Sequence, residues 1–364
     1  MGKYSLENYE IYKTKKIRPV LLSTPQDNYG RGQINYITCS WAELEPHRGC
    51  YRFAALLEEV LVTFNPVLIL KPDYPDWVKD YQEECFTRFI RRAGSYFEKN
   101  NSSLIGTVIT TINNKIVEWD AYLEGFRNFT LFADLHNYEL ISFLKNRKQE
   151  FGIRISCSED NWIKCCEDLA GQFLQNHWER KPVLLHVLDE TLGQETQRQA
   201  LQWHAGFSNK KLNLGFHIAL RRLTYTEKVS SGGVLPARFW FVNTGSSPCY
   251  SDLKIKLKLI REDEIHLINV SSAPSDWPVG DIIQNEIIQL PSLEEGNYSL
   301  SVGIFHKNDL PVSMGIDGKQ NDGFYKMGDI RIDYVNRDNL KNVWENYYPE
   351  GYYPLEDPKR PEVQ

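Results

Sequence analysis

Residues 34–72, INYITCSWAELEPHRGCYRFAALLEEVLVTFNPVLILKP, contain two short apolar runs separated by a helical pattern. The runs 34–41 and 66–72 have the length and composition of buried strands, whereas 53–64 has apolar residues at helical spacing. A strand, a helix and a second strand in this order are typical of a parallel sheet, because the helix returns the chain to the same end of the sheet. This stretch therefore predicts an α/β fold.

The same alternation continues along the chain from about residue 18 to residue 210. Further candidate strands lie at 19–23, 103–112, 130–136, 152–158, 181–188 and, more weakly, 203–208. Helical patterns lie between them, at 81–100, 117–126, 138–151, 161–179 and 194–205. The clearest has an apolar stripe at spacings of three and four: Cys85, Phe86, Phe89, Ile90, Ala93 and Phe97. Eight strands favour a compact (β/α)8, TIM-like barrel over an open doubly wound sheet.

After residue 212 the pattern changes to short strands with no helical periodicity. Lys254, Lys256 and Lys258 alternate with Ile255, Leu257 and Leu259, which is the pattern of a half-buried strand. Several such strands, separated by Gly, Ser and Pro, predict an antiparallel β-sandwich. The predicted organisation is an N-terminal extension (1–17), a barrel (18–211), a β-sandwich (212–334) and a Tyr/Pro-rich tail (335–364).

Composition excludes several classes of function. The formal net charge is −6, and no Lys/Arg cluster with interleaved aromatic residues stands out, so no nucleic-acid partner is expected. No apolar run is long enough to cross a membrane, and the N-terminus has no secretory signal, so a cytoplasmic protein is expected. The seven cysteines are scattered, which indicates free thiols rather than a metal site. No cofactor is predicted, and the oligomeric state is left open.

Two segments resemble known proteins. SWAELEPHRGCYRF (40–53) resembles a segment of the β-galactosidase-like family 42 glycoside hydrolases, W-x-x-L-E-P-x-x-G-x-Y-x-F, matched here by Trp41, Leu44, Glu45, Pro46, Gly49, Tyr51 and Phe53. The second half is similar to the small β-sandwich that follows such barrels in uncharacterised bacterial proteins. That match lies at LGF (214–216), NTG (243–245), Tyr250, Asp252, Gly296, Tyr298 and the segment DGFYKMG (322–328). The resemblance covers about residues 20–334 and implies a carbohydrate or a small glycoside as the ligand.

The resemblance also implies where the catalytic carboxylates should be. Glycosidases of this kind use two carboxyl groups across the sugar, one as acid and one as nucleophile or base. The acid of the clan follows strand four, often as Asn-Glu, but Asn113 and Asn114 stand at that point. Relatives with the sandwich carry Gly-Glu-Trp downstream, and Glu118-Trp119 matches its end, so Glu118 is the candidate acid. The alternative is a solvated glutamate in the first turn of a helix, favoured by the helix dipole.

The second carboxylate departs from the family pattern. Relatives show Pro-Val-x-x-Glu at strand seven, where this chain has His186 after Pro182 and Val183. A neutral imidazole cannot form a glycosyl ester, although it could bind a sugar hydroxyl. Asp189 and Glu190, three and four residues further on, are the candidate replacements.

Other polar and aromatic residues at the strand ends are predicted to line the same mouth, because the carboxyl ends of parallel barrel strands meet there. The predicted substrate-binding residues are Trp41, Lys71, Asp73, Asn113, Asn114, Trp119, Asp134, His136, Glu159 and His186. The spacing of Asp134, His136 and Glu159 fits no metal motif. Three hypotheses remain open: a glycoside hydrolase with an atypical carboxylate pair, a non-catalytic carbohydrate- or protein-binding pseudoenzyme, and a barrel used for a different, biosynthetic reaction.

Overall fold

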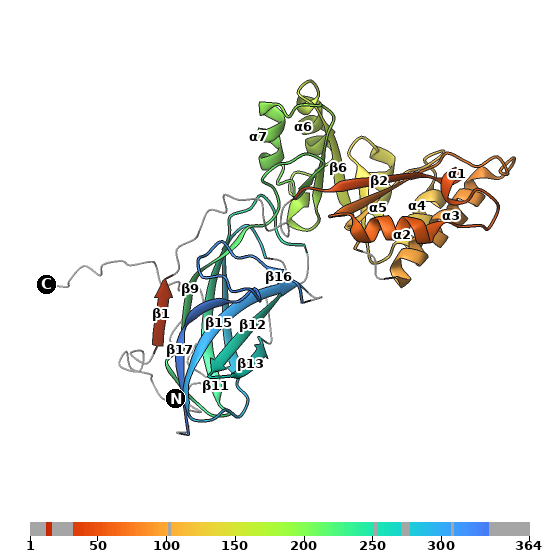
Figure 1. Ribbon diagram of the computed structural model, residues 1–364. Coiled ribbons are helices and arrows are strands. Elements are labelled where there is room, and N and C mark those ends of the chain that lie inside the picture. Colours follow the sequence, from red (N-terminus) through yellow and green to blue (C-terminus); the bar gives the residue numbers. More distant parts are fainter. Residues whose placement is uncertain are drawn as a thin grey trace. The chain divides into compact units, whose positions relative to one another are not determined.

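The computed structural model describes residues 12–16, 32–100, 103–250, 253–270, 277–306 and 309–334. The chain forms two compact units (Figure 1). One, called the α/β unit here, contains residues 30–216 and 245–250, and the other, called the β unit, contains 1–29, 217–244 and 251–364. Neither unit is one continuous segment. The domain limits expected from the sequence, 18–211 and 212–334, stay predictions, and the tail at 335–364 lies outside the described residues.

The α/β unit is built on a seven-stranded parallel sheet whose strands follow one another in chain order. The strands are β2 (Asn35–Ser40), β3 (Pro66–Lys71), β4 (Gly106–Val108), β5 (Thr130–Asp134), β6 (Gly152–Cys157), β7 (Val183–Val187) and β8 (Phe207–Ser208). The sheet curls strongly. At one end, Gln33 beside β2 forms a parallel bridge with Ser208 of β8, and the Ile34 amide donates to the Ser208 carbonyl at 2.9 Å.

Seven of the eight predicted strands are thus confirmed. The predicted strand at 19–23 lies outside the described residues, and β8 and β2 bond directly to each other where an eighth strand would separate them. A complete (β/α)8 barrel is therefore not confirmed, and the α/β unit is described as a curled parallel sheet.

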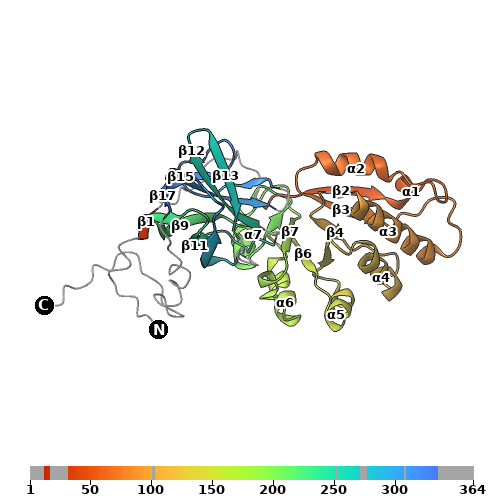
Figure 2. The ribbon, with the colours of Figure 1, turned by 90° about the horizontal axis from the view of Figure 1, so that it is seen from below.

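The helices cover the outer face of this sheet, in chain order along it (Figure 2). They are α1 (Trp41–Leu44), α2 (Phe53–Val62), α3 (Gln82–Lys99), α4 (Ile116–Gly125), α5 (Tyr138–Asn146), α6 (Trp162–Gly171) and α7 (Gln194–Gln202). The predicted stripe on α3 is confirmed, since Phe86, Phe89 and Phe97 are fully buried against the sheet. Helices α3 and α4 approach closely at Gly94, where an added Cβ would lie 2.3 Å from the Gly125 backbone.

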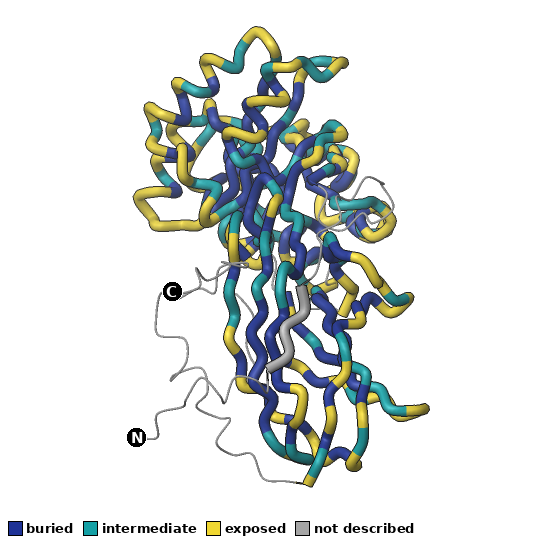
Figure 3. Tube along the Cα trace, turned by 90° about the vertical axis from the view of Figure 1, so that its left-hand side faces the viewer, coloured by how far each residue is buried: buried dark blue, intermediate teal, exposed yellow. Residues whose placement is uncertain are grey.

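The two faces of the sheet carry different cores because side chains alternate along a strand. On β3, Leu68 and Leu70 face the large core under the helices, whereas Val67 and Ile69 face the concave side. There a second, smaller core forms from Ile34, Val67, Val108, Phe132 and Leu184. In Figure 3, buried residues run along the strands and exposed residues along the loops. Ile34 and Leu184 of the small core lie at the starts of β2 and β7, so the side chain two positions further on the same side of the sheet can be polar.

The β unit contains two further sheets. The first has the order β1 (Tyr12–Lys16), β9 (Ile218–Thr226), β11 (Val234–Asn243) and β14 (Gly280–Gln289). The second has the order β10 (Lys228–Ser230), β17 (Tyr325–Asp333), β15 (Gly296–His306), β12 (Leu253–Arg261) and β13 (Glu264–Asn269), with β16 (Pro311–Val312) paired to β15. The strand-rich pattern after residue 212 is confirmed, whereas the packing of these sheets as a sandwich stays a prediction.

One detail of the predicted alternation on β12 is corrected. Ile255, Leu257 and Leu259 are buried as expected, but Lys258 is also buried, at 4% exposure. Its ammonium group donates to the carboxylate of Asp322 at 2.7 Å, which compensates the charge that burial takes out of water.

Residues 245–250 leave the β unit and pack with the α/β unit. The Ser246 carbonyl lies 2.8 Å from His204 Nδ1, and the His204 ring stacks on Trp178 with ring centroids 3.7 Å apart. The Tyr250 hydroxyl donates to the Trp178 carbonyl at 2.6 Å. His204 is therefore a structural residue that joins this segment to the rest of the α/β unit.

Candidate functional site

Five polar side chains follow the small core on the concave side of the sheet. They are Tyr36 (β2), Asp134 (β5), Arg154 and Ser156 (β6) and His186 (β7), and they are called the inner cluster here. Tyr36, Asp134 and His186 each stand two residues after an apolar residue of the small core, so strand alternation places them on the same face. Asp134 and His186 lie at or next to the carboxyl ends of β5 and β7, the end at which parallel α/β sheets bind ligands, whereas Tyr36 lies near the start of β2.

Side chains of the inner cluster that come from different strands contact one another on the concave side of the sheet. The rings of Tyr36 and His186 meet edge to face, with centroids 5.2 Å apart and planes at 79°. The Arg154 guanidinium carbon lies 5.4 Å from the Tyr36 ring centroid, and Arg154 Nη1 lies 3.7 Å from Asp134 Oδ2. The Ser156 hydroxyl donates to the same oxygen of Asp134 at 3.4 Å.

Burial keeps two of these groups neutral. The pKa of His186 is lowered to about 4, first by burial and then by the positive charge of Arg154. Burial raises the pKa of the Tyr36 hydroxyl to about 12, against the opposing effect of Arg154. At neutral pH the inner cluster therefore presents a phenol, an uncharged imidazole, a guanidinium cation and a carboxylate.

Three buried polar atoms of this cluster have no hydrogen-bond partner among the residues that the structure describes. They are the Tyr36 hydroxyl oxygen, Arg154 Nε and His186 Nδ1. Leaving a buried polar group without a partner costs about 1–3 kcal/mol, so three at one place indicate a site that a ligand or ordered water completes.

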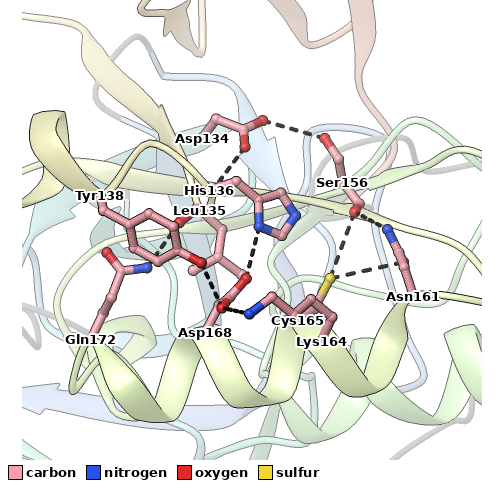
Figure 4. A network of polar contacts seen from close by, with 10 residues as sticks. All are labelled: Asp134, Leu135, His136, Tyr138, Ser156, Asn161, Lys164, Cys165, Asp168 and Gln172. Carbon is pink, nitrogen blue, oxygen red and sulfur yellow. Dashed lines mark hydrogen bonds and ion pairs between the residues drawn. The ribbon is translucent and has the colours of Figure 1, made fainter.

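A second polar group lies beside the inner cluster and is centred on Asp168 of α6 (Figure 4). The Asp168 side chain is 5% exposed, and its carboxylate contacts His136 Nδ1 at 2.9 Å, the Tyr138 hydroxyl at 2.7 Å and Lys164 Nζ at 2.8 Å. Burial acts to raise the pKa of Asp168, but the bonds from Lys164, Tyr138 and His136 outweigh it and lower the pKa. The His136 backbone amide donates to Asp134 at 3.1 Å, which connects the two groups.

Glu118, the predicted acid, does not take part in the inner cluster. It lies in the first turn of α4, as expected, but it is 1% exposed rather than solvated. Its carboxylate accepts the backbone amides of Ile112 at 2.6 Å, Asn113 at 3.1 Å and Lys115 at 3.1 Å. These bonds hold the loop between β4 and α4, and the catalytic role of Glu118 stays a prediction.

Of the two predicted second carboxylates, Asp189 binds a backbone amide, as does the predicted substrate-binding residue Glu159. Asp189 accepts the Glu159 amide at 2.9 Å, and Glu159 accepts the Thr196 amide at 2.8 Å. Glu190 is exposed, and its carbonyl accepts a bond from Lys210 at 3.1 Å. Their contacts connect the loops after β6 and β7.

The two tryptophans among the predicted substrate-binding residues are core residues. Trp41 is fully buried, packs on Trp77, and donates to Glu45 at 2.8 Å. Trp119 is 5% exposed and packs on Phe143 with ring centroids 4.8 Å apart. Neither indole offers a free face on which a sugar could stack, because the strand ends and helices around them cover both.

The remaining predicted residues lie outside the inner cluster. Lys71 and Asp73 are exposed after β3. Asn113 donates to Glu83 at 2.6 Å and lines a cleft of about 450 Å³ beside the start of α3. Asn114, with a left-handed φ of 57°, exchanges hydrogen bonds with Asn137. A neighbouring cleft of about 600 Å³ is lined by Arg48, Trp77, Tyr81 and Arg88, among others, and includes no inner-cluster residue.

Of the predicted site residues, the structure thus brings Asp134 and His186 together, with His136 adjacent. Sequence reasoning missed Tyr36, Arg154, Ser156 and Asp168. The first three could have been found from strand alternation, since each follows a small or apolar inward residue by two or four positions. Asp168 had no such signal, because it reaches the site from the middle of a helix.

Fold and site together define a mixed α/β protein with a curled, seven-stranded parallel sheet, additional β-sheets and a polar cluster on the concave side of the parallel sheet. No protein-family model matches the chain, and no curated protein matches it. Membership of family 42 is therefore not shown.

Solved structures match only weakly. A β-glucosidase from Listeria innocua in complex with glucose is 9% identical, with a TM-score of 0.19, and the match covers 63% of this chain and 46% of that one. The CARDB domain of the PF1109 protein from Pyrococcus furiosus is 11% identical, with a TM-score of 0.21, and the match covers 34% of this chain and 95% of that one. The alkylpurine DNA glycosylase AlkC of Pseudomonas fluorescens is 8% identical, with a TM-score of 0.21, covering 60% and 48%. These values are too low to support an argument about function.

Two features are absent from the described residues. None of their helices is long and apolar enough to span a membrane. Nor do His, Cys, Asp and Glu side chains in this part of the chain form a group of three or more suited to a metal ion.

Proposed function

We propose that the inner cluster binds a carbohydrate and that the site does not hydrolyse glycosidic bonds. The observation that carries the proposal is the set of three buried, unpartnered polar atoms on Tyr36, Arg154 and His186. Sugar hydroxyls both donate and accept hydrogen bonds, so one sugar ring can satisfy a phenol, an imidazole and a guanidinium together. The chain's resemblance to glycosidase barrels favours the same class of ligand.

The absence of hydrolysis follows from the carboxylates. Of the five inner-cluster residues only Asp134 carries one, whereas both glycosidase mechanisms need two across the sugar. Glu118 is held by three backbone amides, and protonating it to act as an acid would weaken all three bonds.

A binding measurement on the full chain tests the proposal. Isothermal titration calorimetry with a panel of monosaccharides and disaccharides should detect a ligand, and His186→Ala together with Tyr36→Phe should weaken its binding. His47→Ala, at an exposed position outside the cluster, is the matched control. Hydrolysis of 4-nitrophenyl β-galactoside that depends on Glu118 would refute the non-hydrolytic part of the proposal.

One observation favours a second function, proton transfer at His136. The buried Asp168 carboxylate accepts a hydrogen bond from Nδ1, which fixes the imidazole with its proton on that nitrogen and leaves Nε2 as the base. The His136 side chain is 39% exposed, so an external molecule can reach Nε2. This arrangement is suited to general acid–base chemistry on a bound sugar.

The two nitrogens can be distinguished by ¹⁵N NMR of the histidine side chains. The wild-type protein should show His136 protonated on Nδ1, and Asp168→Asn should allow the other tautomer. Equal populations in the wild-type protein would remove the support for this second function.

A further inference from the structure

Arg154 has fewer acceptors than its charge requires. A guanidinium presents five N–H donors, and the Arg154 side chain is only 18% exposed. Its nearest carboxylate contact in the described structure, Asp134 Oδ2, lies 3.7 Å from Nη1, beyond ordinary hydrogen-bond length, and Nε has no partner there. A largely buried cation compensated this weakly is costly unless something else supplies negative charge.

Asp134 compensates the charge of Arg154 only across 3.7 Å, and its oxygens also accept bonds from two neutral donors. Oδ1 accepts the His136 amide at 3.1 Å, and Oδ2 accepts the Ser156 hydroxyl at 3.4 Å. The pairing with Arg154 is therefore shared with two further donors.

The neighbouring carboxylate of Asp168 is already paired with Lys164 at 2.8 Å, and Lys210 adds a further positive charge near the cluster. Lys210 is close enough for its charge to lower the pKa of His186, as Arg154 also does. Lys210 Nζ donates to a backbone carbonyl, that of Glu190, so this bond does not neutralise it. His186 and Tyr36 are neutral at pH 7 and contribute no charge.

We infer that the carbohydrate bound by the inner cluster carries an anionic group, a carboxylate or a phosphate, which Arg154 holds. A planar guanidinium binds either group through two parallel N–H donors, and such charge-assisted pairs are the strongest of protein hydrogen bonds. Tyr36 and His186 then bind sugar hydroxyls. This inference rests on the proposed carbohydrate-binding function and specifies the class of carbohydrate.

The test compares sugars that differ only in the anionic group. Calorimetry with the full chain is carried out on D-glucose against D-glucuronate, D-galactose against D-galacturonate, and D-glucose 6-phosphate. The acidic sugar of a pair should bind at least about tenfold more tightly, the effect of one charge-assisted pair. The comparison of glucuronate with glucose 6-phosphate shows whether a carboxylate or a phosphate is preferred.

Arg154→Met removes the cation while keeping an unbranched apolar side chain, and Arg92→Met at an exposed position on α3 is the matched control. The preference for the acidic sugar should disappear in Arg154→Met alone, so that the acidic and the neutral sugar of a pair bind this variant equally. The wild-type comparison does not depend on the folding of any variant.

Each outcome decides between the two proposals. Equal binding of neutral and acidic sugars overturns the anionic ligand and leaves the carbohydrate site. Binding of inorganic phosphate but of no sugar, lost in Arg154→Met, supports the anion and overturns the carbohydrate. No binding of any of these compounds overturns both.

Discussion

Replacing Glu118 by Gln separates a structural glutamate from a catalytic one. The carboxylate of Glu118 accepts three backbone amides at 2.6–3.1 Å in the loop that leads from β4 into α4. Glutamine has one oxygen acceptor, and its NH2 group would face an amide donor. The variant therefore loses at least one charge-assisted bond and leaves a buried N–H without a partner.

The expected cost follows from these two losses. A hydrogen bond to a charged group contributes about 1.5–3 kcal/mol, and an unpartnered buried donor costs about 1–3 kcal/mol. Because part of the loop can relax toward water, we take a net loss of about 3 kcal/mol in the free energy of unfolding of the α/β unit. For a domain of about 200 residues this lowers Tm by about 6–12 °C.

Thermal unfolding followed by circular dichroism measures this shift, with Glu124→Gln as the control. Glu124 lies on the same helix, is 52% exposed and pairs with Arg91 on the surface, where an ion pair contributes about 0–1 kcal/mol. An unchanged Tm in Glu118→Gln, combined with lost hydrolysis of a glycoside, would refute the structural explanation and restore Glu118 as an acid.

Further variants test the packing and the electrostatics. Gly94→Ala should destabilise the α/β unit by about 1–3 kcal/mol in urea unfolding, because its Cβ would overlap the backbone of Gly125. Gly171→Ala, also in a helix but with open space at Cβ, should instead be neutral or stabilising, and equal effects would contradict the close approach of α3 and α4. The pKa of His186 is about 4 in the folded protein, so the unfolded chain takes up this proton near pH 6.5 and the folded protein only near pH 4. The free energy of unfolding therefore decreases as pH falls from about 6.5 to 4, by about 1–2 kcal/mol after allowance for the partial exposure of His186. Between pH 7 and 4.5 the free energy of unfolding of His186→Gln should decrease by correspondingly less than that of the wild-type protein. Histidine NMR should also show a higher pKa for His186 in Arg154→Met than in the wild-type protein. An unchanged pKa would mean that Arg154 lies too far from His186 for both residues to bind one ligand.

The parallel sheet was predictable because its pattern is local. From residue 34 onward, short apolar runs form the strands and apolar stripes, such as that of Phe86, Phe89 and Phe97, form the buried faces of the helices. Burial of these apolar residues determines where the strands and helices form. The number of strands in the curl was not predictable in the same way. It depends on whether Gln33 reaches Ser208, a contact between residues far apart in the sequence.

The candidate site was predictable only in part, for a related reason. A residue at a strand end can be placed on the rim from its position alone, which is how Asp134 and His186 were found. Whether a carboxylate is free or engaged depends on backbone amides that fold back toward it, as the amides of Ile112 and Asn113 do toward Glu118. Motif similarity cannot show such bonds. It favoured Glu118, whose carboxylate binds backbone amides of its own loop.

The chain's path through residues 245–250 has a consequence for synthesis and for engineering. Ser246 and Tyr250, which contact His204 and Trp178, are translated only after β9 and β11 of the β unit. The α/β unit therefore cannot acquire its complete set of contacts on the ribosome until more than 30 further residues have emerged beyond residue 216. A fragment that ends at residue 216 lacks residues 245–250 and their contacts. For the same reason, the two units cannot be exchanged between proteins by joining the chains at a single point.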